Sequence, residues 1–220
     1  MKILVSWSSG KDAAWTLHRL RQAHPDAVAG LLTTTNSAFD RVAMHGVRRE
    51  VLEAQAAAAA LPLHVVPLPW PCSNDDYERL MGTATAAFVA DGVTHIAFGD
   101  LFLEDVRQYR IDRLAGSGMT PLFPLWKTTD TRTLAESMIA GGLQARLSTV
   151  DPRVLDSAFA GRAFDRLLLR DLPDGVDPCG ERGEFHSCVW DGPMFHHPVP
   201  LAVGEVVTRD GFTFADLELL

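Results

Sequence analysis

Short apolar runs alternate with longer stretches of helical periodicity through the first half of the chain. The apolar runs cover 2–6, 27–34, 63–68 and 94–98, and helices are expected at 12–24, 47–60 and 74–91. Because these runs do not alternate with polar residues, strands made from them must be buried on both faces. Buried strands separated by helices form a parallel sheet with helices on either side. The sequence therefore predicts an α/β fold, with one parallel-sheet domain at about residues 1–125.

After about residue 125 this alternation stops. We expect a short helix at 134–140, a strand at 144–150 and a helical stretch at 154–169 that Gly161 interrupts. The remainder is rich in Gly and Pro, with short β-prone runs such as 185–190 and 205–208. This pattern predicts a smaller α+β domain at residues 126–220 that completes the site.

Charge and cysteine content narrow the classes of partner. The 220-residue chain has a formal net charge of −8, which argues against non-specific binding to nucleic acid because such binding relies on Lys and Arg. Its three cysteines form no CxxC pair, so a disulfide framework is not expected. No secretory signal or apolar run long enough for a membrane span is visible. We therefore expect a cytoplasmic protein without a membrane partner. The alternative of a homo-oligomer stays open.

The loop between the first strand and the first helix has the composition of a phosphate-binding turn. It reads Ser8-Ser9-Gly10-Lys11-Asp12-Ala13, and the helix N-terminus behind it aims backbone N–H groups at a ligand. A Walker A loop is excluded because Val5 stands where its first Gly is required and Asp12 where it needs Ser or Thr. The alternative is a plain turn in which the serines cap the helix.

Other candidates follow later strand ends. Gly99 and Asp100 come directly after the run 94–98, so they are expected to face the same crevice as the loop. Arg107 and Arg110 lie three residues apart on one predicted helix face, where they could meet phosphates or form surface ion pairs. His45 precedes a helix and could reach a nucleotide or substrate, although a loop histidine is usually only solvated.

A second motif, CGERGEFHSCVWDGPMF, spans residues 179–195. Glu181 and Glu184 flank a glycine-rich turn, and His186 and Ser187 follow on a predicted strand. Two carboxylates and an imidazole this close can bind a cation, position an amine or shuttle protons. The alternative is a solvated turn that leads into a hairpin.

Both motifs resemble those of a known family. The loop 8–13 is similar to the S-G-G-x-D-S pyrophosphate loop of the N-type ATP pyrophosphatases, from which it departs at Ser9 and Ala13. The stretch 179–195 resembles the C-G-E-x-G-E-[FY]-[EH]-T motif, followed by D-x-P-x-F, of the diphthine–ammonia ligase family. Further matching residues are Gly99, Asp100, Arg107, Arg110, 124–126 and Glu136. The resemblance implies a Rossmann-like nucleotide-binding domain of the adenine nucleotide alpha hydrolase type.

That resemblance also implies an activity and a set of partners. The family uses ATP and Mg²⁺ to adenylate a carboxylate, with pyrophosphate as leaving group, and ammonia then displaces AMP to form an amide. Its named acceptor is diphthine, a modified histidine of translation elongation factor 2. In a bacterial source the acceptor would have to be another carboxylate.

The resemblance assigns roles to residues as well. The loop Ser8, Ser9, Gly10, Lys11, Asp12 and Ala13 would hold the phosphates, and Asp12 and Asp100 would contact Mg²⁺ or ribose. Glu181, Glu184 and His186 would line the acceptor side and bind and deprotonate ammonium. Further candidate substrate contacts are His45, Arg107, Arg110, Gly180, Gly183 and Ser187.

Two alternatives stay open. One is a nucleotide-binding sensor without turnover, which Ala13 allows because it lacks the hydroxyl found at the last position of the pyrophosphate loop. The other is a tRNA-modifying ATP pyrophosphatase, which the acidic charge and the lack of CxxC pairs disfavour.

Overall fold

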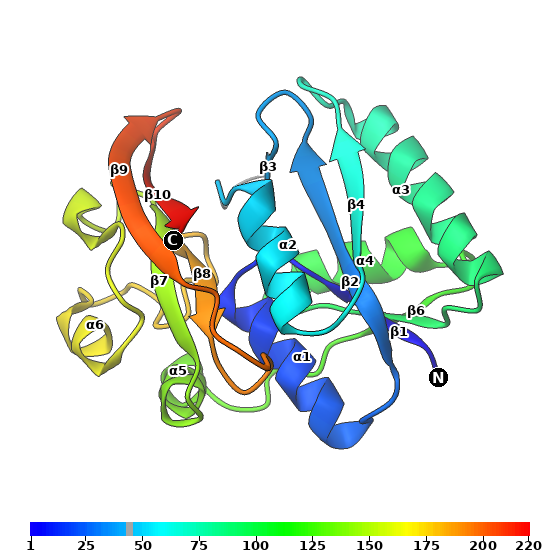
Figure 1. The fold of residues 1–220 in the computed structure, drawn as a ribbon, viewed down its shortest axis with the longest axis horizontal. Coiled ribbons are helices and arrows are strands. Elements are labelled where there is room, and N and C mark those ends of the chain that lie inside the picture. Colours follow the sequence, from blue (N-terminus) through cyan, green and yellow to red (C-terminus); the bar gives the residue numbers. More distant parts are fainter. Residues whose placement is uncertain (43–45) are drawn as a thin grey trace.

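The chain forms a mostly parallel sheet and a separate antiparallel sheet, as Figure 1 shows. This computed structural model describes residues 1–42 and 46–220. The strands of the first sheet are β1 (Ile3–Ser6), β2 (Val28–Asn36), β3 (Arg41–Val42), β4 (Leu63–Leu68), β5 (His95–Ala97) and β6 (Thr120–Leu122). The helices between them are α1 (Lys11–Ala23), α2 (Arg49–Ala58), α3 (Asn74–Ala90) and α4 (Glu104–Leu114). The predicted α/β class is confirmed.

Strand order in the parallel sheet creates a crevice beside β1. From β1 the chain builds outward through β2 and β4 on one side, and then returns to add β5 and β6 on the other. All these pairs are parallel, and the short β3 runs antiparallel against the end of β2. In such sheets ligands bind beyond the carboxyl ends of the strands where the order reverses. That position lies between the ends of β1 and β5.

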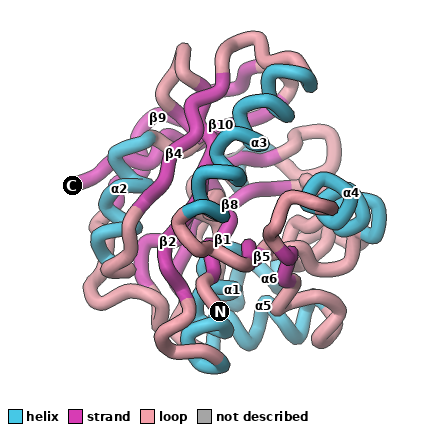
Figure 2. The backbone as a smooth tube through the Cα atoms, turned by 90° about the vertical axis from the view of Figure 1, so that its right-hand side faces the viewer, coloured by secondary structure: helices cyan, strands magenta, loops and turns pink. Residues whose placement is uncertain are grey.

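The two faces of the parallel sheet pack differently. Ile3, Val5 and Leu31 point to the face that α1 and α2 cover, and they belong to the main apolar core. Leu4 and Leu32 alternate to the opposite face, below α3 and α4. Figure 2 shows α2 and α3 on opposite sides of β4. Neither α3 nor α4 has a fully buried residue, so this second face is only loosely covered.

The second half of the chain forms the antiparallel sheet. Its strands are β7 (Gln144–Val150), β8 (Phe185–Asp191), β9 (Leu201–Arg209) and β10 (Phe212–Leu219), paired in the order β8-β7-β10-β9. Its helical elements are α5 (Thr131–Ala140), the 3₁₀ turn η1 (Ser157–Phe159) and α6 (Arg166–Asp171). In Figure 1 this sheet lies at one end of the molecule, and α1 and α2 lie between it and the parallel sheet.

One expectation for the second half was wrong and another was confirmed. The helical stretch expected at 154–169 is instead a 3₁₀ turn, an extended segment and a short helix, because residues 161–164 pair with the edge of β7. Gly161 N–H donates to Leu147 O at 2.8 Å and Phe164 N–H to Ala145 O at 2.8 Å. The β-prone run at 205–208 is confirmed as a strand, since it lies within β9, and β9 and β10 form a hairpin whose turn Asp210-Gly211 has positive φ at both residues.

One continuous apolar cluster joins the two sheets. It includes Ile3 and Leu17 from the first half and Leu147, Phe185 and Leu217 from the second. The predicted division near residue 125 falls between β6 and α5 and stays a prediction. In the described part of the chain, no helix combines the length and apolarity needed to cross a membrane.

Candidate functional site

The loop 8–13 lies at the carboxyl end of β1 and begins α1. Ser9 adopts a left-handed backbone conformation with φ of 71°, which is uncommon for a residue other than glycine. Gly10 is the N-cap of α1. Gly99 packs directly behind this turn, since a Cβ on Gly99 would lie 2.8 Å from the carbonyl carbon of Asp12. The structure therefore brings the loop and the end of β5 together, as the strand order predicts.

Strand β8 holds the loop from the other side. The Lys11 N–H donates to the Ser187 hydroxyl at 3.1 Å, and the Val189 N–H donates to the Ser9 carbonyl at 2.9 Å. These residues are about 180 positions apart in the sequence. The two motifs that the sequence singled out thus form one site.

The Lys11 side chain is buried and points to the second motif. Its ammonium donates to Asp12 Oδ2 at 2.8 Å and to the carbonyl of Cys179. Burial acts most strongly and would lower the pKa of Lys11, but Asp12, Cys179 and Glu181 together outweigh it, so the pKa lies above its usual value. Asp12 Oδ1 is also buried and has no hydrogen-bond partner among the described residues. A buried carboxylate oxygen of this kind is suited to a cation that arrives with the ligand.

Asp177 and Glu184 shape the turn between them. Asp177 Oδ1 accepts from the N–H groups of Cys179 and Glu181, at 2.9 and 3.3 Å. Glu184 accepts from Asp177 N–H with one oxygen and from Arg182 N–H with the other, both at 2.9 Å. Glu184 therefore holds the turn with both of its oxygens. Sequence reasoning missed Asp177, although an Asp shortly before a glycine turn is a known turn signal.

Gly180, Gly183 and Ser187 were candidate substrate contacts. Gly180 has φ of 67°, and a Cβ there would meet the Phe185 carbonyl at 2.6 Å. Gly183 also has positive φ, so both glycines are required by the path of the turn. The Ser187 hydroxyl accepts from the loop backbone, as described above.

Glu181 connects the turn to the end of β5. Its Oε1 accepts from the Leu101 N–H at 2.8 Å. Burial raises the pKa of Glu181 to about 7, and the nearby Asp12 carboxylate adds to the increase. His186 follows shortly after it in sequence, on β8, and burial together with Lys11 lowers the pKa of its imidazole to about 4. At neutral pH, Glu181 is thus divided between acid and base forms, and His186 is neutral.

A cavity of about 730 Å³ opens next to the loop, on the face of the sheet below α3 and α4. Ser6, Trp7 and Ser8 form one wall of it, and His186 reaches it from β8. The other lining residues are Leu32, Thr33, Thr34, Val42, Tyr77, Glu78, Met81, Gly82, Thr85, Ala86, Ile96, Phe98, Tyr109, Arg110, Arg113, Leu114 and Ser117. Its size and mixed apolar and polar walls are typical of a small-molecule site.

Arg107 and Arg110 of α4 lie in different environments. Arg110 lines the cavity and binds both oxygens of Asp100, at 2.7 and 3.3 Å. Arg107 lies over the rings of Phe123 and Trp126, each 5.1 Å from the guanidinium carbon. Asp100 is therefore held at the end of β5 by an ion pair.

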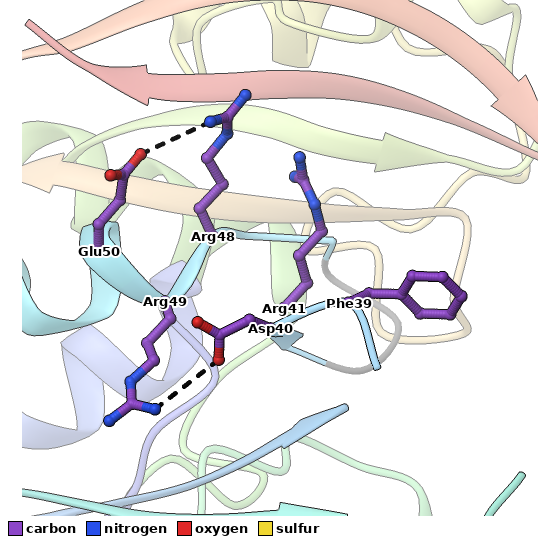
Figure 3. Close-up of a pocket in the computed structure, with 6 residues that line it drawn as sticks. All are labelled: Phe39, Asp40, Arg41, Arg48, Arg49 and Glu50. Atoms are coloured by element: carbon purple, nitrogen blue, oxygen red, sulfur yellow. Dashed lines mark ion pairs between the residues drawn. The ribbon is translucent and has the colours of Figure 1, made fainter. Parts of the chain in front are cut away.

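His45 lies outside the described residues. A smaller pocket of about 240 Å³ is lined by Phe39, Asp40, Arg41, Arg48, Arg49 and Glu50 and is drawn in Figure 3. Its arginines have acidic partners, because Arg41 and Arg48 both bind Asp216 of β10. Figure 3 also shows Arg48 paired with Glu50. The ion pairs of Arg41 and Arg48 with Asp216 therefore anchor the β9–β10 hairpin.

The donor set at the loop fits Mg²⁺ only when phosphate is present. Among the described residues, no group of three or more His, Cys, Asp or Glu side chains is placed to hold a metal by itself. Mg²⁺, however, is commonly held by one or two carboxylates together with phosphate oxygens and water. Asp12, with its unpartnered buried oxygen beside the loop, fits that arrangement.

A mostly parallel α/β sheet with a glycine-containing loop at its switch point defines a Rossmann-like protein joined to a smaller domain. Residues 130–213 match the family model of the diphthamide synthase C-terminal domain. The whole chain aligns with diphthine–ammonia ligases of Bos taurus and Homo sapiens, at 26% and 25% identity over 90% of each relative. The Danio rerio ligase is 26% identical, over 94% of its length. The resemblance to the diphthine–ammonia ligase family is thereby confirmed.

Proposed function

We propose that this protein is an ATP-dependent ligase that converts a carboxylate to an amide with ammonia. The observation that carries the proposal is the contact between the two motifs. The loop at residues 8–13 is bonded through Ser9 and Lys11 to the strand that bears His186 and Ser187. The names of the full-length relatives support the same chemistry, because each is a diphthine–ammonia ligase.

On the phosphate side, the backbone of Ser8–Ala13 and the N-terminus of α1 would hold the β- and γ-phosphates of ATP. Asp12 would hold Mg²⁺, which neutralises phosphate charge when bound. The close packing of Gly99 keeps the first turn of α1 in place. The large cavity next to Ser8 offers room for the nucleoside.

The reaction then has two steps. An oxygen of the acceptor carboxylate attacks the α-phosphorus of ATP, the bond to the bridging oxygen breaks, and pyrophosphate leaves. Ammonia attacks the carbonyl carbon of the resulting acyl adenylate, AMP leaves and an amide forms.

Glu181 is our choice for the base that deprotonates ammonium. Its pKa of about 7 leaves it partly ionised at neutral pH, which suits a general base. Glu184 is less suited because both of its oxygens accept backbone N–H groups. His186 lines the cavity and, as a neutral imidazole, would orient the acceptor or nucleotide.

Diphthine of elongation factor 2 is the acceptor in a source that makes it, and another carboxylate serves otherwise. The experiment is to measure AMP and pyrophosphate released from ATP with Mg²⁺ and ammonium, over a panel of carboxylate acceptors. Acceptor-dependent release that Asp12→Ala abolishes and the exposed-site control Asp26→Ala retains is the expected result. Release of ADP and orthophosphate would contradict the proposal. Nucleotide binding without release from any acceptor would favour the sensor.

A further inference from the structure

Gln55 is a buried polar residue that joins the two motifs. It lies on the inner face of α2 and is fully buried (0% exposed) among apolar neighbours such as Leu52 and Ala56. A buried amide is costly unless its polar atoms are hydrogen-bonded. The hydrogen-bond partners of Gln55 therefore indicate its structural role.

The Gln55 amide bonds to three separate segments. Its Oε1 accepts from the indole N–H of Trp7 at 2.9 Å. Its Nε2 donates to the Ser9 carbonyl at 3.2 Å and to the Val189 carbonyl at 2.6 Å. The orientation of the amide is determined by chemistry, because an indole N–H can only donate and a carbonyl can only accept. One side chain thus ties the residue that follows β1, the loop and β8 together.

The bond to Ser9 controls the direction of the next N–H group. Ser9 O receives both Gln55 Nε2 and the Val189 N–H, so this carbonyl is held toward α2 and β8. In a trans peptide the carbonyl and the following N–H point in opposite directions. The Gly10 N–H therefore points away from β8, toward the hydroxyl of Ser8, which lines the large cavity.

The backbone of Ser9 shows why such a bond is needed. Its φ of 71° is unfavourable for a residue with a side chain. A conformation of this kind persists when surrounding contacts hold it. The two hydrogen bonds to the Ser9 carbonyl are contacts of that kind.

We infer that Gln55 is a positioning residue that orients the Ser9–Gly10 peptide so that its N–H can bind a phosphate. This inference rests on the proposed phosphate role of the loop and adds the element that sets its geometry. Gln55 does not touch the ligand. Its effect should therefore fall on phosphate recognition and not on recognition of the nucleoside.

The test compares the affinities of ATP and adenosine by calorimetry in the wild type, Gln55→Met and Gln22→Met. Gln22→Met is the matched control, because Gln22 is an exposed residue of α1. Losing one well-placed N–H to a phosphate should weaken ATP binding about 10- to 100-fold. Adenosine binding should change less than about threefold, and Gln22→Met should bind both ligands as the wild type does.

Hydrogen exchange gives a readout without ligand. The Val189 and Gly10 amides should exchange faster in Gln55→Met than in Gln22→Met. If Gln55→Met does not fold, Gln55→Glu replaces it: the carboxylate faces two carbonyls at neutral pH, and protonation in mild acid should restore ATP affinity.

The possible outcomes are distinct. Equal ATP affinity in Gln55→Met and the wild type would overturn this inference and leave the proposed function intact. Equal losses for ATP and adenosine would also overturn it, because they would indicate a merely structural role. A wild type that binds neither ligand would refute the proposed function, and this inference with it.

Discussion

Replacing Glu181 with Gln should make the protein more stable at alkaline pH while removing its activity. Gln keeps the shape and the acceptor oxygen that receives the Leu101 N–H at 2.8 Å, but it cannot ionise. In the wild type, burial raises the pKa of this carboxyl from its usual value near 4.5 to about 7. The folded state therefore resists ionisation that the unfolded state permits.

The direction in which stability changes with pH follows from proton binding. Between pH 4.5 and 7 the folded state holds more protons at this position than the unfolded state does, so wild-type stability falls as pH rises and levels off above 7. At about 1.36 kcal/mol per pH unit, the full displacement corresponds to about 3 kcal/mol. Because this carboxyl is only half-buried, solvent screening reduces the expected effect to about 1–2 kcal/mol.

The assay is urea unfolding at pH 4.5 and pH 8, followed by tryptophan fluorescence. We expect the free energy of unfolding of Glu181→Gln to equal that of the wild type at pH 4.5 and to exceed it at pH 8. Glu205→Gln, at an exposed position of β9, serves as the control and should show no such difference. A variant that is less stable than the wild type at pH 8, or a pH-independent difference, would refute the reasoning.

Three further predictions test other parts of the structure. Gly99→Ala should destabilise the protein by about 1–3 kcal/mol, because its Cβ would meet the backbone of α1 at 2.8 Å, whereas Gly82→Ala on α3 has open space and should stabilise it slightly in the same urea titration. Asp216→Asn should cost about 1–2 kcal/mol at pH 7; two arginines hold the pKa of this carboxyl below its usual range, so the difference in unfolding free energy from the wild type should shrink as pH falls below about 4. The imidazole of His186 should stay neutral down to about pH 5 in an NMR titration, since burial lowers its pKa to about 4; a midpoint near 6.5 would contradict the buried placement.

The sequence was most informative where the pattern of neighbouring residues alone determines the structure. The strands at 63–68 and 94–98 and the helix at 74–91 depend on hydrophobic runs and turn signals within a few residues. Ser73 caps that helix, since its hydroxyl accepts from the Asp76 N–H. The Asp210-Gly211 turn carried the same kind of signal but was overlooked.

Features set by distant contacts could not be found in this way. Residues 161–164 lie close to helical segments in the sequence, yet they form hydrogen bonds with β7. No pattern among neighbouring residues predicts that partner. Gln55 occupies an apolar helix face, where a polar residue is usually an exception to the pattern and not a sign of a site. The direction of the Lys11 side chain depends on a carbonyl at Cys179, which only the folded chain brings close.

The contacts between the motifs imply that the first 125 residues alone do not hold the loop at residues 8–13 as the full chain does. Ser9 O, Lys11 N–H and the Lys11 ammonium all bond to residues between 179 and 189. A chain that ends at residue 125 would leave the Lys11 N–H without its Ser187 partner, and would leave Ser9 O and the Lys11 ammonium with only Gln55 and Asp12. It would also uncover apolar side chains that pack against β7 and β8. Leaving buried polar groups unsatisfied costs about 1–3 kcal/mol each. We therefore expect a fragment of residues 1–125 to bind ATP at least tenfold more weakly than the full chain by calorimetry, even where circular dichroism shows folded helices. Full affinity in that fragment would mean that the second half positions the acceptor without shaping the nucleotide site.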